Sequence, residues 1–168
     1  MNLPPLSKNI TWHGGKIRPE ERNAYFGHAA ATVWLTGLSG AGKSTIAFEL
    51  ERLLFQSGHA CYVLDGDNVR QGLNRDLGFS PAHRTENIRR IAEVARLFND
   101  AGVFVISAFI SPYRADRNMA REVIGADNFI ETWLDTDISV CEGRDPKGLY
   151  KKGAGRRYPE LYRCVRAL

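Results

Sequence analysis

The 168-residue sequence predicts one three-layer α/β domain in which helices cover both faces of a mainly parallel sheet. Three observations support this fold class. Short apolar runs have the length and composition of buried strands. Segments with helical spacing of apolar residues separate these runs, as in β-α-β units. A glycine-rich loop joins the first run to the first of these helices. The predicted strands are Thr32–Thr36, Ala60–Leu64, Gly102–Ile106 and Phe129–Leu134.

The segment before the first strand, residues 1–28, is expected to form an N-terminal arm that packs on the domain. It contains one possible short helix, Pro19–Phe26, and no residues at catalytic spacing. We expect the domain proper over residues 29–152 and a separate basic tail over residues 153–168.

The loop after the first strand matches the phosphate-binding pattern G-x-x-x-x-G-K-[ST]; it reads Gly37-Leu38-Ser39-Gly40-Ala41-Gly42-Lys43-Ser44. Glycine lacks a Cβ, so the backbone can adopt positive φ and turn its N–H groups inward around an anion. The helix predicted over Lys43–Leu54 adds the positive end of its dipole. Lys43 is then expected to reach the β- and γ-phosphates of a nucleotide, and Ser44 to ligate Mg²⁺. The strand before the loop and the helix after it argue against a chance match.

Two carboxylates, Asp65 and Asp67, follow the second strand, where open α/β sheets bind ligands. They flank Gly66 in a turn, so they are either functional residues or ordinary turn residues that cap the next helix. Because a phosphate-binding loop is expected at the same edge of the sheet, we favour the functional interpretation.

A long helix is predicted to begin at Pro81, with Ser80 as its N-cap, and to end before Gly102. Its apolar stripe places Arg84 and Asn87 on the first turn of the inward face. These two side chains either bond the helix end or a neighbouring carboxylate, or line a cleft and hold an anionic, hydrogen-bonding ligand.

Two further segments lie after the third strand. Ser111 falls near the carboxyl end of that strand and could cap the following helix, with Pro112 at its first position. Arg114, Arg117 and Arg121 have helical spacing and are expected on an exposed face. The charged stretch at residues 144–152 is either a mobile lid that brings cations over a transferring phosphoryl group or a solvated loop.

Composition limits the function classes. Residues 1–150 carry 17 Lys and Arg against 18 Asp and Glu, so the positive charge behind the formal net charge of +4 lies in the last 18 residues, and no nucleic-acid partner is expected. The chain has no stretch of about 20 apolar residues, which predicts a soluble, cytoplasmic protein without a membrane partner. Its three cysteines lack the spacing of a disulfide framework or a zinc site.

Six motifs occur in a fixed order: G-L-S-G-A-G-K-S-T (37–45), D-G-D-N-V-R (65–70), G-L-N-R-D-L-G-F-S (72–80), E-N-I-R-R (86–90), F-I-S-P-Y-R (109–114) and R-D-P-K-G-L-Y-K-K (144–152). Together they resemble the adenylyl-sulfate kinase family, whose members have the P-loop kinase fold and use ATP to phosphorylate the ribose 3′-hydroxyl of adenosine 5′-phosphosulfate. The resemblance covers roughly residues 9–152. It implies ATP and Mg²⁺ as cofactors, a homodimer and association with ATP sulfurylase.

The resemblance also implies site residues. Asp67 matches the position that assists metal binding and activates the ribose hydroxyl, with Asp65 nearby, and Ser111 matches a serine described as a phosphorylated intermediate in bacterial members. The nucleotide-binding positions are Gly37, Leu38, Ser39, Gly40, Ala41, Gly42, Lys43, Ser44, Thr45 and Arg144. The substrate-binding positions are Asp65, Arg70, Phe79, Arg84, Asn87, Ile110 and Lys147, with Phe79 packing on the adenine.

After Lys152 the sequence departs from the family pattern. Members continue with an aromatic segment that helps to enclose the substrate base, then a strand that would flank Phe129–Leu134, and a final helix. We therefore expect the last strand to be missing, activity to be reduced, and the apolar edge to promote dimerisation or aggregation. The alternatives are another small-molecule P-loop kinase, or a nucleotide-binding domain without turnover.

Overall fold

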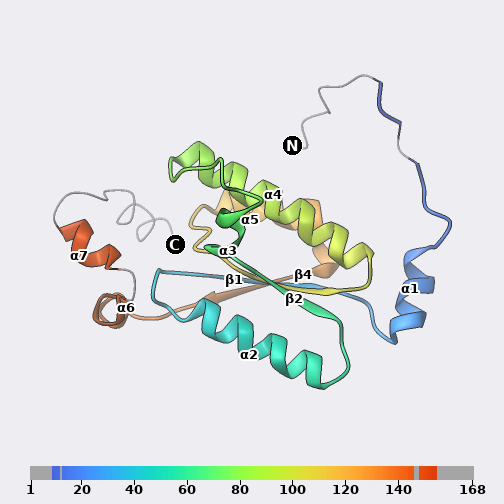
Figure 1. Cartoon of the computed structure of the whole chain (residues 1–168), viewed down its shortest axis with the longest axis horizontal. Helices are drawn as coiled ribbons and strands as arrows, with labels where there is room; N and C mark the ends of the chain where they lie inside the picture. Colours follow the sequence, from blue (N-terminus) through green and yellow to red (C-terminus); the bar gives the residue numbers. More distant parts are fainter. Residues whose placement is uncertain (1–8, 12, 146–147, 155–168) are drawn as a thin grey trace.

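The structure is a computed structural model that describes residues 9–11, 13–145 and 148–154. Four strands and the helices around them follow one another in the order expected of β-α-β units (Figure 1). The strands are β1 (Thr32–Gly37), β2 (Cys61–Asp65), β3 (Phe104–Ala108) and β4 (Phe129–Leu134). The helices are α1 (Pro19–Phe26), α2 (Lys43–Gln56), α3 (Asn68–Gln71), α4 (Pro81–Asp100), α5 (Arg114–Ile124), a 3₁₀ turn (Ala126–Asn128), α6 (Ile138–Arg144) and α7 (Leu149–Ala154).

The four strands form a parallel sheet in the order β2-β3-β1-β4. Helix α2 covers one face, and α4 and α5 cover the other, which gives the three layers predicted (Figure 1). Since the connections from β1 and β3 leave toward opposite faces, the carboxyl ends of these two strands border a crevice. The predicted fold class is confirmed, and the crevice is where its ligand site is expected.

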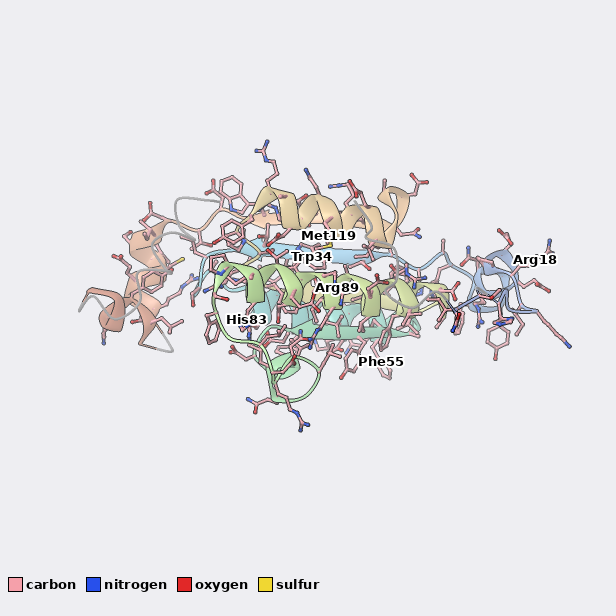
Figure 2. All side chains as sticks on the ribbon, turned by 90° about the horizontal axis from the view of Figure 1, so that it is seen from above. Arg18, Trp34, Phe55, His83, Arg89 and Met119 are labelled. Atoms are coloured by element: carbon pink, nitrogen blue, oxygen red, sulfur yellow. The ribbon has the colours of Figure 1, made fainter. Side chains whose placement is uncertain are left out.

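The larger core lies between the sheet and the α4–α5 layer. Trp34 of β1 is its central side chain, fully buried and in ring contact with Phe109 and Phe129. Figure 2 shows Trp34 beside α4 and α5, whereas Phe55 at the end of α2 reaches outward. A smaller core joins α2 to the sheet through Leu35 and Ala47. Both cores hold β1 firmly, and β1 carries the glycine-rich loop.

Several element boundaries differ from prediction. The third strand begins at Phe104 instead of Gly102, because Gly102 adopts φ +87° and terminates the α4 segment. Helix α2 is only partly buried: Leu50 and Leu54 pack against the smaller core, whereas Ile46 and Leu53 are nearly half exposed.

The segment after β3 was also predicted wrongly in detail. Ser111 does not cap α5, because this helix begins at Arg114 and its N-cap is Tyr113. Arg117 is not on an exposed face, since its guanidinium pairs with Glu131 at 2.7 Å and donates to the backbone oxygens of Ser111 and Pro112. The two backbone oxygens just before α5 both accept hydrogen bonds from the Arg117 guanidinium. The helical spacing of the arginines alone does not predict this contact.

The two ends of the described chain lie at opposite ends of the sheet (Figure 1). Helix α1 matches its predicted range, and the arm reaches the domain through Phe26, which lies against Gly102, and His28, which stacks on Phe104. At the other end, part of the 144–152 stretch predicted as a lid or loop is helical, because α6 ends at Arg144 and α7 begins at Leu149. No helix within the described ranges is long and apolar enough to cross a membrane.

Candidate nucleotide and phosphoryl-transfer site

The glycine-rich loop has the backbone shape expected of a phosphate cradle. Its three glycines all have positive φ: Gly37 +151°, Gly40 +79° and Gly42 +101°. Two of them also have no space for a side chain, because a Cβ on Gly37 would lie 2.9 Å from the Leu134 oxygen and one on Gly40 3.0 Å from the Cys141 oxygen. The loop therefore depends on glycine both for its conformation and for its close contact with the β4–α6 segment.

Lys43, the first residue of α2, is buried and 9% exposed. Its ammonium donates to the backbone oxygens of Gly37 at 2.9 Å and Leu38 at 2.6 Å. These bonds fold the side chain back over the loop, so its charge lies within the concave cradle, where a phosphate anion would be neutralised.

Ser44 is the second residue of α2, and its hydroxyl donates to the Asp65 carboxylate at 2.6 Å. The other oxygen of Asp65 accepts the backbone N–H of Asp67 at 2.9 Å. Asp65 is 7% exposed, at the end of β2, so the glycine-rich loop and the carboxylate turn are joined directly. Asp67 sits at the N-cap of α3 without a side-chain cap bond to that helix, which argues against the simple capping alternative.

This arrangement can accommodate Mg²⁺. Proteins hold this ion with one or two carboxylates, substrate phosphates and water, instead of a complete protein cage. A serine hydroxyl and two carboxylates lie next to the cradle, and no cluster of three or more His, Cys, Asp or Glu occurs in the part of the chain that is described. The donor set therefore fits an ion shared with a bound nucleotide and would not suit a closed structural metal site.

The opposite wall carries two guanidinium groups around one aromatic ring. Arg70 lies 4.5 Å and Arg84 5.6 Å from the ring centre of Phe79, which is 59% exposed. Arg70 donates to the Leu77 and Gly78 oxygens, and Arg84 to the Phe79 oxygen. Burial lowers the pKa of Arg70, and the charge of Arg84 lowers it further. Two neighbouring cations in a partly buried wall favour an anionic ligand.

Three more predicted residues lie at the cleft: Asn87, Ile110 and Ser111. Asn87 is 4% exposed on the inward face of α4. Ser111 is 3% exposed, with an unusual φ of +34°. Its hydroxyl accepts from the Trp34 indole at 3.1 Å and donates to the Thr36 hydroxyl at 2.9 Å. Ser111 thus ties the Ile110–Pro112 loop to β1.

The charged C-terminal stretch lies against the cradle. Arg144 donates to the Gly40 oxygen at 3.2 Å, and the Tyr150 hydroxyl donates to the Ser39 oxygen at 2.9 Å. Tyr150 is 4% exposed. The stretch is therefore docked on the loop in this structure. Lys147, predicted to contact substrate, lies outside the described residues.

These walls border a cleft of about 920 Å³, near the upper end of the range typical of small-molecule sites. Besides the residues predicted, the cleft is lined by side chains that sequence reasoning missed: Ile46, Ile88, Phe109, Pro112 and Leu149. Ile88 and Phe109 lie within the quoted motifs, yet their apolar character made them indistinguishable from core residues. Gly37 and Leu38 contribute backbone oxygens to Lys43.

Comparisons with known proteins agree with this geometry. The family model described as adenylylsulphate kinase matches residues 29–159. The adenylyl-sulfate kinase of Erwinia tasmaniensis is 57% identical over 145 residues, which cover 86% of this chain and 72% of that protein. The enzyme of Staphylococcus haemolyticus is 56% identical, over 92% of this chain and 78% of its own length. The structure of the Mycobacterium tuberculosis APS kinase CysC in complex with AMPPNP and APS is 52% identical, with a TM-score of 0.73 over 76% of each chain.

Proposed function

Because this chain belongs to the adenylylsulphate kinase family, we propose that it transfers the γ-phosphoryl group of ATP to the ribose 3′-hydroxyl of adenosine 5′-phosphosulfate. The product is 3′-phosphoadenosine 5′-phosphosulfate. One observation carries this proposal: a single cleft joins a complete phosphate cradle to a wall with two guanidinium groups around an exposed phenylalanine. Such a wall suits a second nucleotide that has an anionic group and an aromatic base.

The cradle is the donor half of the site. Backbone N–H groups of the loop and the Lys43 ammonium would bind the ATP phosphates, and Arg144, at the rim of the loop, adds a further cation. At about 4 Å and an effective dielectric constant of about 20, one cation contributes about 4 kcal/mol of attraction to a unit anion. Two or three such cations are therefore sufficient in scale to balance the charge of the transferring group.

Ser44, Asp65 and Asp67 would hold Mg²⁺ together with the ATP phosphates. The ion, when bound, neutralises phosphate charge during transfer. The resemblance assigns this role to Ser44 and Asp67, and the 2.6 Å bond between Ser44 and Asp65 adds Asp65 to the proposal. Asp67 would also orient the acceptor hydroxyl and take its proton.

The guanidinium wall is the acceptor half. Arg70 and Arg84 would bind the phosphosulfate, Phe79 would stack on the adenine, and Ile110 would line the same pocket. Held in this way, the ribose hydroxyl faces the γ-phosphoryl group across the cleft, as in-line transfer requires.

We assign Ser111 a positioning role. Its hydroxyl is already bonded on both sides, to Trp34 and to Thr36, and it is almost completely buried. In-line transfer to a ribose hydroxyl needs alignment and charge neutralisation without a covalent relay. A Ser111→Ala variant should therefore retain turnover within about tenfold, whereas loss of turnover together with normal binding of both nucleotides would support the phosphorylated intermediate.

Assembly and location are further parts of the proposal. Strand β4 pairs with β1 alone in the described sheet, and its Ile130 and Trp133 are 51% and 56% exposed, so we propose a homodimer through this edge. Light scattering of wild type and Ile130→Lys would test it.

Association with ATP sulfurylase stays a prediction, testable by co-elution. A cytoplasmic location suits a reaction that consumes ATP, and Cys61 and Cys141 are free thiols.

Lys43→Met tests the proposed reaction. It keeps the aliphatic stem while removing the charge, so we expect a folded protein whose turnover falls by about 10³-fold, the equivalent of about 4 kcal/mol. Substantial retained activity would rule out the mechanism. An ATP-binding chain without single-turnover transfer would instead favour the binding-only alternative, and transfer to other hydroxyl acceptors would favour a different small-molecule kinase.

The expectations for the tail beyond residue 154 concern residues outside the described part of the chain.

A further inference from the structure

The acceptor wall contains a buried amide pair that the mechanism above does not use. Asn74 lies in the connection between α3 and α4 and is 0% exposed. Its side-chain Nδ2 donates to Oδ1 of Asn87 at 3.0 Å. Asn87 lies on the inward face of α4 and borders the cleft, while Asn74 is not among the lining residues.

This bond determines which end of the Asn87 amide faces the cleft. A primary amide has an oxygen that accepts and a nitrogen that donates two hydrogens. Because Asn74 occupies the Asn87 oxygen, the Asn87 nitrogen is the end offered to a ligand, and no hydrogen bond joins it to another residue of the described ranges. The cleft therefore presents donors at this position. With the opposite amide orientation it would present an acceptor.

Asn74 itself is fixed firmly. Its backbone N–H donates to the Val69 oxygen at 2.8 Å, and its backbone oxygen accepts from the Leu77 N–H at 3.0 Å. Arg70, on the same α3 turn, also donates to the Leu77 oxygen. The segment that carries Asn74 is thus bonded to the segment that carries the anion-binding guanidinium.

A purely structural role for Asn74 is a poor explanation of its burial. Its Oδ1 is buried with no hydrogen-bond partner in the described part of the chain, and a buried polar atom without a partner costs stability. A leucine, which has the same number of side-chain heavy atoms, would occupy this position without an unpaired polar atom. The feature that leucine cannot supply is the N–H donated to Asn87.

We propose that Asn74 is a positioning residue that orients Asn87, so that the Asn87 amide donates to acceptor atoms of bound adenosine 5′-phosphosulfate. The inference rests on the proposed function. It assigns the specificity of this subsite to polarity: a ligand with an acceptor atom here is bound, and one with a hydrogen-bond donor here is rejected.

Calorimetric titration of the full chain with adenosine 5′-phosphosulfate tests the inference in a double-mutant cycle. Asn74→Leu should raise the Kd for this ligand about five- to tenfold, the effect of one lost hydrogen bond, and leave the Kd for ATP unchanged. In an Asn87→Ala background, Asn74→Leu should have almost no further effect, because its partner is gone. An equal loss in both backgrounds would mean a general structural role and would overturn the inference.

Asn99→Leu is the matched control. Asn99 lies near the far end of α4, the helix that carries Asn87, and there it accepts from Thr32 at 2.7 Å and donates to the Val103 oxygen at 3.1 Å. This variant should lower the melting temperature without changing the Kd for adenosine 5′-phosphosulfate. If it raised the Kd as much as Asn74→Leu does, instability alone would explain the effect, and the inference would fail.

Asn74→Asp keeps the test decisive if the leucine variant does not fold. An ionised carboxylate only accepts, so it would make Asn87 donate to it and turn its oxygen into the cleft. At pH 8.5 the Kd of Asn74→Asp for adenosine 5′-phosphosulfate should rise further than that of Asn74→Leu, because the Asn87 oxygen then faces an acceptor atom of the ligand. An unchanged Kd would overturn the inference. Wild type that binds no adenosine 5′-phosphosulfate would overturn the proposed function itself, whereas normal wild-type binding with unaffected variants overturns only the inference.

Discussion

Gly40 offers a direct test of whether the phosphate cradle depends on its contact with α6. Its φ of +79° is left-handed, and a Cβ would lie 3.0 Å from the Cys141 oxygen. Gly40→Ala therefore has two effects. The backbone conformation costs about 1–2 kcal/mol for a residue with a Cβ, and the loop or α6 must move by a few tenths of an ångström.

Gly58 provides the matched control. Its φ of +84° is almost the same, but a Cβ there would meet no described atom within 4 Å, and it follows the far end of α2. Gly58→Ala should thus show the backbone cost alone. For a chain of this size, each 1 kcal/mol lowers the melting temperature by about 2–4 °C, so Gly58→Ala should melt about 2–8 °C below wild type, and Gly40→Ala at least as far below it.

Only Gly40→Ala should also weaken ATP binding. Misaligning one loop N–H relative to a phosphate removes a charge-assisted hydrogen bond of about 1.5–3 kcal/mol, which raises the Kd about 10- to 100-fold. Scanning calorimetry without nucleotide and titration with ATP would measure the two effects separately. The reasoning is refuted if Gly40→Ala binds ATP like wild type, or if Gly58→Ala loses as much affinity.

Three further predictions concern stability and the docked α7 segment. Hydrogen bonds from Arg89, and then from Arg90, lower the pKa of Glu86 to about 2. Glu86→Gln should therefore melt below wild type at pH 7, and this difference in melting temperature should vanish as the pH falls from 4.5 toward 2. A difference that stays constant with pH would contradict this. Burial raises the pKa of Asp116, so its ionised form costs stability at neutral pH. Asp116→Asn should melt above wild type at pH 7, and this gain in melting temperature should shrink as the pH falls toward 4. A lower melting temperature of the variant at pH 7 would be the contrary result. Tyr150→Phe removes the bond to the loop oxygen and should cost about 1 kcal/mol and weaken ATP binding several-fold; unchanged ATP affinity would show that this contact does not support the cradle.

The fold and the donor half could be predicted from the sequence because their signals are local. Strand β4 has its predicted bounds, and the glycine spacing of the loop corresponds to three positive φ values. In each case a few neighbouring residues determine the backbone conformation, so a pattern in the sequence is sufficient.

The remaining features depend on contacts between distant parts of the chain. Ser111 has the sequence of an N-cap, but bonds to Trp34 and Thr36, 77 and 75 residues away, hold it elsewhere. The order of β1 and β3 in the sheet creates these bonds. Asn74 lies within the 72–80 motif, but nothing in the sequence pairs it with Asn87, which is 13 residues away on another element. Such pairings follow from topology and packing, which one sequence does not display.

The central claim is that the two halves of the cleft act together on one phosphoryl group. The most direct measurement is the release of ADP by the full chain, with ATP and Mg²⁺, in the presence and absence of adenosine 5′-phosphosulfate. We expect release that depends on adenosine 5′-phosphosulfate and equals the amount of 3′-phosphorylated product. Release at the same rate without this acceptor, or bound ATP with no release in its presence, would contradict the claim.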